Sequence, residues 1–168
     1  MGENISEGGA VEALQPVPRY EDCGPPGAEH RGHAERSRDA ERGRAVSLDD
    51  VQAFVAGTRD LPRDAVLVTI DDGSVSTLRV AAPILARHRI PAVAYVTSSL
   101  IGLGDLGHGE RFLSWEELSE LADSGIAIGS HAHTHRSLGK MPPTEAREEA
   151  RRSKETIEQK LGRPVTSF

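Results

Sequence analysis

Three short apolar runs alternate with helical patterns, and this alternation constrains the fold more than any other feature of the sequence. The runs cover residues 65–70, 92–96 and 126–128 and consist mainly of Val, Ile and Ala. Uninterrupted apolar runs of this length are typical of strands that are buried on both faces of a parallel sheet. Because a helical pattern separates consecutive runs, the sequence predicts an α/β fold with a parallel sheet or barrel and right-handed crossovers.

Helices are predicted from capping residues and apolar spacing over residues 47–57, 75–88, 114–125 and 144–161. Ser114 and Glu117 have the spacing of a capping box, in which each side chain binds the other residue's backbone N–H. Pro83 lies inside the second helix and should bend it or loosen one turn, because proline has no N–H to donate. The apolar positions expected to face the core are Val51, Phe54 and Val55 in the first helix and Ala146, Ala150, Ile157 and Leu161 in the last. Residues 165–168 are predicted to begin a fourth strand.

Residues 1–44 differ in composition from the rest of the chain. They combine Gly, Pro and dense charge of both signs with few large aliphatic side chains. This composition is typical of segments that cannot bury enough apolar surface to fold. We therefore expect a weakly ordered segment over 1–44 and a folded domain over 45–168.

Charge and composition exclude several classes of protein. The chain has 168 residues, with 20 Lys and Arg against 26 Asp and Glu, and this net charge of −6 argues against a nucleic-acid partner. No apolar run approaches the ~20 residues that a membrane span needs. A single cysteine, Cys23, excludes an internal disulfide. No secretory signal is visible at the start, and the sequence leaves localisation and oligomeric state open.

Polar clusters follow two of the predicted strands directly. Asp71 and Asp72 end the first run, and three histidines occupy residues 131–135 after the third. Ligands of α/β folds bind beyond the carboxyl ends of parallel strands, so both clusters lie where a site is expected. His131 and His135 are four residues apart and can reach one cation, with Asp72 as a candidate third ligand.

The two adjacent carboxylates suggest two different roles, one as a metal ligand and one as a base. Two neighbouring carboxylates repel each other unless a cation or a proton offsets their charge. If one carboxylate bound a metal, the other would be free to act as a base. The simpler interpretations are a solvated Asp-Asp-Gly turn and a polar histidine loop, and both stay open at this point.

These residues resemble a known family. The segment Val68–Gly73 is similar to the Thr-Phe-Asp-Asp-Gly motif of the polysaccharide deacetylases, the NodB-homology group of carbohydrate esterase family four. Ser130–His135 is similar to the second motif of that family, His-Ser/Thr-x-x-His. Flanking segments that also resemble the family are residues 46–50, 81–85, 90–92, 113–115 and 128–131. The resemblance runs from about Arg44 to Phe168.

The resemblance implies a fold and a chemistry. The fold would be an incomplete, deformed (β/α) barrel of the NodB-like type. The activity would be hydrolysis of non-peptide carbon–nitrogen bonds, removing acetyl groups from N-acetylated sugars in carbohydrate metabolism. Asp72, His131 and His135 would bind a divalent metal, zinc, whose bound water attacks the amide with Asp71 as general base. The partner would be an acetylated carbohydrate, whose identity these motifs do not specify.

The sequence also departs from the family pattern. Ala132 stands where the family has Ser or Thr, and His133 is an extra imidazole that we expect to face solvent. Phe168 would open the third motif, and the family's general-acid histidine belongs to a later one. An alternative is therefore a chain truncated before its third motif that binds metal and turns over poorly or not at all. A two-His-one-carboxylate iron oxygenase is a weaker alternative, because Asp71 would have no task in that chemistry.

Overall fold

The computed structural model describes residues 44–104 and 109–168. The segment 1–44, predicted to be weakly ordered, therefore lies outside the described residues except for Arg44, and so does Cys23. In the part that is described, the strands are β1 (Val68–Asp72), β2 (Ala92–Val96) and β3 (Ala127–Ser130).

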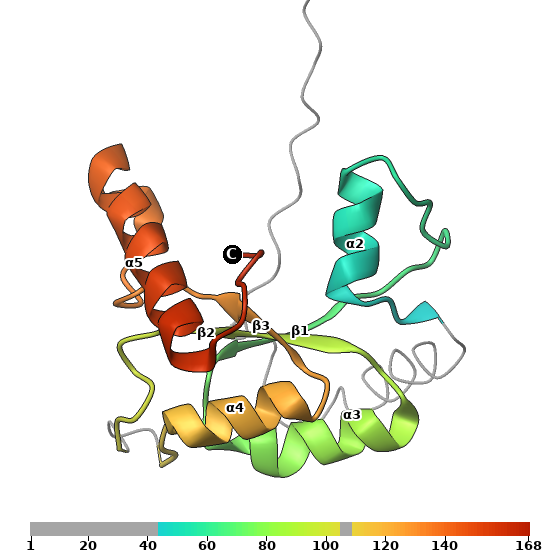
Figure 1. Cartoon of the computed structure of the whole chain (residues 1–168), viewed down its shortest axis with the longest axis horizontal. Helices are drawn as coiled ribbons and strands as arrows, with labels where there is room; N and C mark the ends of the chain where they lie inside the picture. The colour runs from blue at the N-terminus through green and yellow to red at the C-terminus, as the bar shows by residue number, and fades with distance from the viewer. Residues whose placement is uncertain (1–43, 105–108) are drawn as a thin grey trace, which may run out of the picture. The chain divides into compact units, whose positions relative to one another are not determined.

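The strands form one parallel sheet in the order β1-β2-β3, which confirms the predicted α/β fold with parallel strands (Figure 1). The register pairs Asp72 with Val96, and Val96 with Ser130. The last residues of all three strands thus lie in one row. The polar residues that end β1 and follow β3 consequently emerge at the same edge of the sheet.

Burial distinguishes the central strand from the first one. Four of the five β2 residues are buried, as predicted for a strand covered on both faces. In β1 the side chains alternate between half-buried and exposed, with Thr69 and Asp71 exposed. The prediction of burial on both faces is therefore wrong for β1. The face of β1 that carries Thr69 and Asp71 is left exposed, and the covering of a face is a tertiary property that an apolar run does not encode.

Helices cover the sheet and connect its strands. The helical segments are α2 (Leu48–Val55), η3 (Thr77–Ala81), α3 (Ala82–His88), α4 (Trp115–Asp123), η4 (Leu138–Lys140) and α5 (Pro143–Leu161). Figure 1 shows α3 and α4 side by side along one face of the sheet. The predicted capping box of Ser114 and Glu117 is present at α4. In this part of the chain no helix is long and apolar enough to cross a membrane.

The loosened turn predicted at Pro83 is confirmed. The turn before it, η3, is π-helical, and the Ala82 N–H donates to the carbonyl of Thr77, five residues back. Pro83 lacks an N–H and its ring crowds the carbonyl four residues earlier. A wider turn relieves that crowding and keeps the helix continuous into α3.

The buried side chains of α2 and α5 agree with the prediction only at Ile157. In α2 only Leu48 is buried, while Phe54 and Val55 are 50% and 80% exposed. In α5 the buried side chains are Glu149, Ser153 and Ile157, which follow one another at four-residue spacing. Of the predicted α5 stripe, Ile157 is buried and the other three residues are half-buried.

The core lies between the sheet and the helices. Its fully buried side chains include Val96, Leu113, Leu118, Leu121 and Ile157. Residues 165–168 are not a strand, contrary to the prediction, although the Ser130 N–H donates to the Ser167 carbonyl at 3.0 Å. One bond beside β3 is too little pairing to extend the sheet.

Candidate metal centre

Asp72, His131 and His135 converge at the carboxyl edge of the sheet. One ligand atom of each lies within 4.8 Å of the others. The Oδ1 atom of Asp72 is 3.4 Å from Nε2 of His131 and 3.0 Å from Nε2 of His135. The three side chains are 37–49% exposed, so the cluster is accessible from solvent. The structure thus brings together the three residues that the sequence selects, and their role as ligands remains a prediction.

The Asp72 carboxylate shows an unsatisfied atom in this cluster. Its Oδ1 atom is buried and has no hydrogen-bond partner among the residues described. A buried carboxylate oxygen without a donor is costly, and a cation would satisfy it.

The donor set itself matches a divalent metal. Two imidazole nitrogens and one carboxylate oxygen are a common catalytic zinc set that leaves a position for water. Bonds of about 2.0–2.1 Å in a tetrahedron put neighbouring ligand atoms roughly 3.3 Å apart. The two nitrogen-to-Oδ1 distances are close to that value. The residues present therefore fit a metal such as zinc.

Unusual backbone conformations concentrate at the same place. Of the four described non-glycine residues with positive φ, three belong to the site: Asp72 (74°), Ala132 (65°) and His135 (61°). Such conformations are sparsely populated by L-residues and cluster at functional sites. At Asp72 the left-handed conformation occurs at the last residue of β1.

The segment after β2 supports the backbone of the histidine loop, residues 131–135. The His131 N–H donates to the Val96 carbonyl at 2.9 Å. The Ser98 N–H donates to the Ala132 carbonyl at 3.3 Å, and the Ser99 N–H to the His133 carbonyl at 3.0 Å. The loop is therefore fixed along one side by backbone hydrogen bonds to the last residue of β2 and to the segment that follows it.

Glu149 of α5 supports the loop from the other side, and sequence reasoning missed it. Its Oε2 atom accepts from the N–H of His133 (3.2 Å), the N–H of Thr134 (2.8 Å) and the Thr134 hydroxyl (2.9 Å). Burial raises the pKa of this carboxyl, but the hydrogen bonds from Thr134 and His133 outweigh it and the pKa lies below its ordinary value. The only sequence signal for its burial is the four-residue spacing to Ser153 and Ile157. This spacing is hard to recognise because most other residues of the helix are charged or polar.

His133 is only partly exposed to solvent, less than expected. It is half-buried, and its Nδ1 atom lies 2.8 Å from the Ser98 hydroxyl. Burial, together with the positive charge of Arg152, lowers the pKa of its imidazole. His133 is also not part of the cluster formed by the other two histidines.

Asp71, the predicted base, is exposed beside this cluster. Within the ranges described, its carboxylate carries no hydrogen bond or ion pair. An unpaired, solvent-facing carboxylate is free to accept a proton. Its role as a base also remains a prediction.

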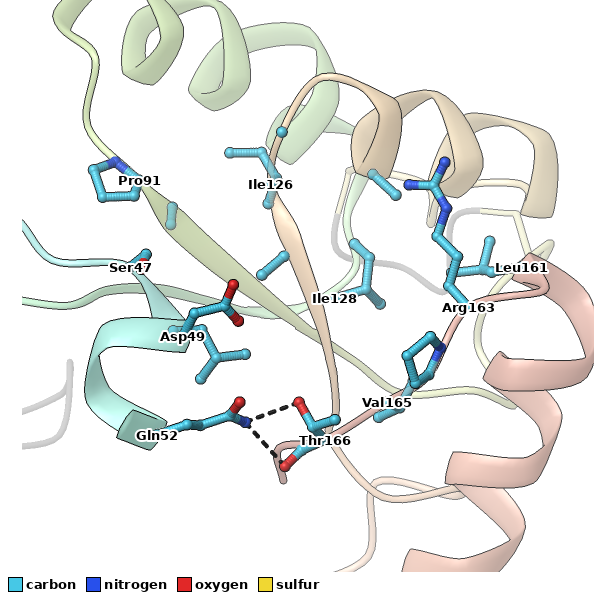
Figure 2. A pocket seen from close by; sticks show the side chains of 16 residues that line it. Ser47, Asp49, Gln52, Pro91, Ile126, Ile128, Leu161, Arg163, Val165 and Thr166 are labelled. Atoms are coloured by element: carbon cyan, nitrogen blue, oxygen red, sulfur yellow. Dashed lines mark hydrogen bonds between the residues drawn. The ribbon is translucent and has the colours of Figure 1, made fainter. Parts of the chain in front are cut away.

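Two cavities flank the sheet at its opposite ends. One of about 260 Å³ adjoins the cluster and is lined by His131, Ala132, His135, Arg136, Ser137, Leu138 and Phe168. The other, of about 430 Å³, opens at the amino ends of β2 and β3, where Ala92 and Ala127 line it. Figure 2 shows how the Gln52 amide of α2 donates there to the carbonyl and hydroxyl oxygens of Thr166. Only the smaller cavity lies at the histidine loop.

Comparison with known proteins identifies relatives of one kind. Residues 58–168 match the family described as polysaccharide deacetylase. A curated relative, the putative polysaccharide deacetylase YxkH of Bacillus subtilis (strain 168), is 28% identical over 101 residues, which cover 60% of this chain and 34% of that protein.

Solved structures of similar fold agree with this. IcaB from Ammonifex degensii superposes with a TM-score of 0.66 at 28% identity, covering 80% of this chain and 63% of the other. The BpsB deacetylase domain from Bordetella bronchiseptica superposes with a TM-score of 0.61 at 25% identity, covering 81% of this chain and 66% of the other. The Streptococcus pyogenes deacetylase PplD, in complex with acetate, superposes with a TM-score of 0.63 at 23% identity, covering 77% of this chain and 56% of the other.

The chain spans about a third of the curated relative and between 56% and 66% of these solved chains. The described sheet and helices accordingly correspond to part of a NodB-like (β/α) barrel, which confirms the expected fold class. Because the family match covers more than half of its residues, this chain belongs to the polysaccharide deacetylase family.

Proposed function

We propose that this protein is a metal-dependent hydrolase that removes acetyl groups from N-acetylated sugars of a carbohydrate. The observation that carries the proposal is the convergence of Asp72, His131 and His135 around an unsatisfied carboxylate oxygen. This cluster lies beside the exposed Asp71 in a member of the deacetylase family.

Asp72, His131 and His135 would hold the metal, for which we propose zinc. A metal held there would act as a Lewis acid that polarises the acetyl carbonyl and lowers the pKa of water. The protein's part is to present one carboxylate oxygen and two imidazole nitrogens close together at an accessible edge of the sheet. Zinc accepts this mixture of ligands readily.

Asp71 would act as the general base. Its carboxylate takes a proton from water as the water oxygen attacks the amide carbon. The carbon–nitrogen bond then breaks as the leaving nitrogen takes up a proton equivalent to the one that Asp71 removed, and the products are acetate and a free amino sugar. The exposed position of Asp71, without a partner among the described side chains, leaves it available for this transfer.

A metal-binding homologue without turnover is the second candidate. The same cluster of Asp72, His131 and His135 supports it, because metal binding by these residues does not by itself require turnover. An acetate-release assay on N-acetylated sugar oligomers separates the two candidates. Release that disappears with a chelator and returns with Zn²⁺ supports the deacetylase. Stoichiometric metal binding without release supports the homologue, and a requirement for redox-active iron contradicts both.

A further inference from the structure

We infer that Glu149 is a positioning residue of the metal centre, which holds the backbone between His131 and His135 in the conformation that presents both imidazoles. The inference rests on the proposed function, because it concerns the same site. It assigns a role to a residue of α5, which lies outside the two sequence motifs and contributes no ligand atom to the cluster.

The contacts of Glu149 are all directed at the histidine loop. Three donors converge on one oxygen, Oε2: two consecutive backbone N–H groups and the Thr134 hydroxyl. Consecutive N–H groups in a turn form a concave site for an anion, and here the anion is the protein's own carboxylate. Glu149 is 9% exposed and is the only charged residue among the buried ones that the structure describes.

The loop requires such support because of its backbone. Residues 131–135 belong to no helix or strand, and Ala132 and His135 both have positive φ. Loss of the Glu149 acceptor would leave the N–H groups of His133 and Thr134 unsatisfied, since neither bonds to another described backbone carbonyl. The loop would then rearrange to reach water, and the rearrangement would displace His135 relative to Asp72.

The attachment of α5 to the sheet does not depend on Glu149. The Ser130 hydroxyl donates to the Ser153 hydroxyl at 2.8 Å in a buried position, and Ile157 is fully buried in the core. Because Ser130 directly precedes His131, the helix also supports the start of the loop. Removal of the Glu149 carboxylate should therefore leave α5 in place and affect the loop selectively.

Zinc affinity of the full chain tests the inference, measured by competition with a chromophoric chelator. We expect Glu149→Ala to weaken zinc binding by about 10–100-fold, the range for residues that orient metal ligands. We expect Glu149→Gln to remain within a few-fold of wild type, because its amide oxygen can accept from the same three donors. Glu148→Ala is the matched control: Glu148 is exposed, pairs with Arg151 and should change nothing.

A spectroscopic readout separates positioning from general stabilisation. The Co²⁺ absorption spectrum reports ligand geometry and should change in Glu149→Ala but not in the control. A lower unfolding temperature of metal-free Glu149→Ala, with unchanged zinc affinity and Co²⁺ spectrum, would overturn the inference and leave the proposed function intact. Failure of the wild-type chain to bind zinc or Co²⁺ would overturn both.

Amide hydrogen exchange provides a test that needs no alanine variant. In the metal-free wild-type chain and in Glu149→Gln, we expect the amides of residues 133 and 134 to exchange slowly. Exchange at the rate of an open loop would contradict the inference, even if Glu149→Ala does not fold.

Discussion

The Nε2 atom of His135 lies 3.0 Å from the Oδ1 atom of Asp72, although Asp72 ends β1, His135 follows β3, and β2 lies between these two strands. The parallel register brings the ends of β1 and β3 into one row, and both residues have a left-handed backbone conformation. The candidate centre is thus a product of strand pairing and of local backbone conformation together.

Asp72→Ala should abolish metal binding. The variant removes the only carboxylate of the cluster and leaves two imidazoles, which hold a divalent cation much more weakly. Metal analysis after dialysis against Zn²⁺ should show about one equivalent in the wild type and a clear loss in the variant. His135→Ala should behave in the same way. Unchanged stoichiometry in both variants would exclude this site.

Asp71→Asn should separate metal binding from catalysis. Asparagine preserves the shape of the side chain but cannot take a proton, so acetate release should fall by about 10²–10⁴-fold. Because Asp71 is not part of the cluster, the metal content should match that of the wild type. An active Asp71→Asn variant would remove Asp71 from the mechanism.

Gly73→Ala should destabilise the fold next to the candidate metal centre, because Gly73 directly follows Asp72. Gly73 has φ of 91°, and a Cβ there would lie 2.9 Å from Ile101 Cδ1 and 3.1 Å from Val96 Cγ1. Strain and crowding together predict a loss of about 2–4 kcal/mol in the free energy of unfolding. Gly57→Ala is the control, because Gly57 also has positive φ but open space around it. It should lose only about 1 kcal/mol in urea titrations, and equal losses would show that crowding is unimportant.

Acid should weaken the fold through Glu117. Hydrogen bonds from Arg111, and then from the Ser114 backbone, lower the pKa of Glu117 from 4.5 to about 2. Since the folded pKa lies below the unfolded one, the stabilisation is complete above about pH 4.5 and is lost as pH falls toward 2. Glu117→Gln preserves the side-chain shape without this titration. The stability difference between the two proteins should therefore shrink from pH 5 to pH 2.5 in denaturant titrations, and parallel profiles would contradict the assignment.

Local features of the structure were predictable because neighbouring residues determine them. The capping box at Ser114 and Glu117 and the widened turn before Pro83 each depend on a few consecutive residues. The central strand β2 was also predicted with its observed bounds. Its apolar run is short, uninterrupted and enclosed by turn formers, so the sequence defines both ends of the strand.

Burial of individual faces was less predictable, because it depends on what packs against them. Thr69 of β1 and Val55 of α2 occupy apolar-looking segments but are exposed in the described fold. Glu149 and Ser153 show the reverse: both are polar, and both are buried because α5 meets the histidine loop and Ser130. A stripe chosen by hydrophobicity alone includes the buried Ile157 but omits these two polar residues of α5.

By itself the sequence determined the alternation of the three strands with helices and the four residues that carry the proposed chemistry, since motifs and caps consist of residues close together in the chain. Only the tertiary structure decided that Asp72, His131 and His135 meet, that Asp72 Oδ1 lacks a donor, and that Glu149 supports the loop between the histidines. The physical reason is that these relations join segments far apart in the chain, and their distances depend on sheet register and helix packing.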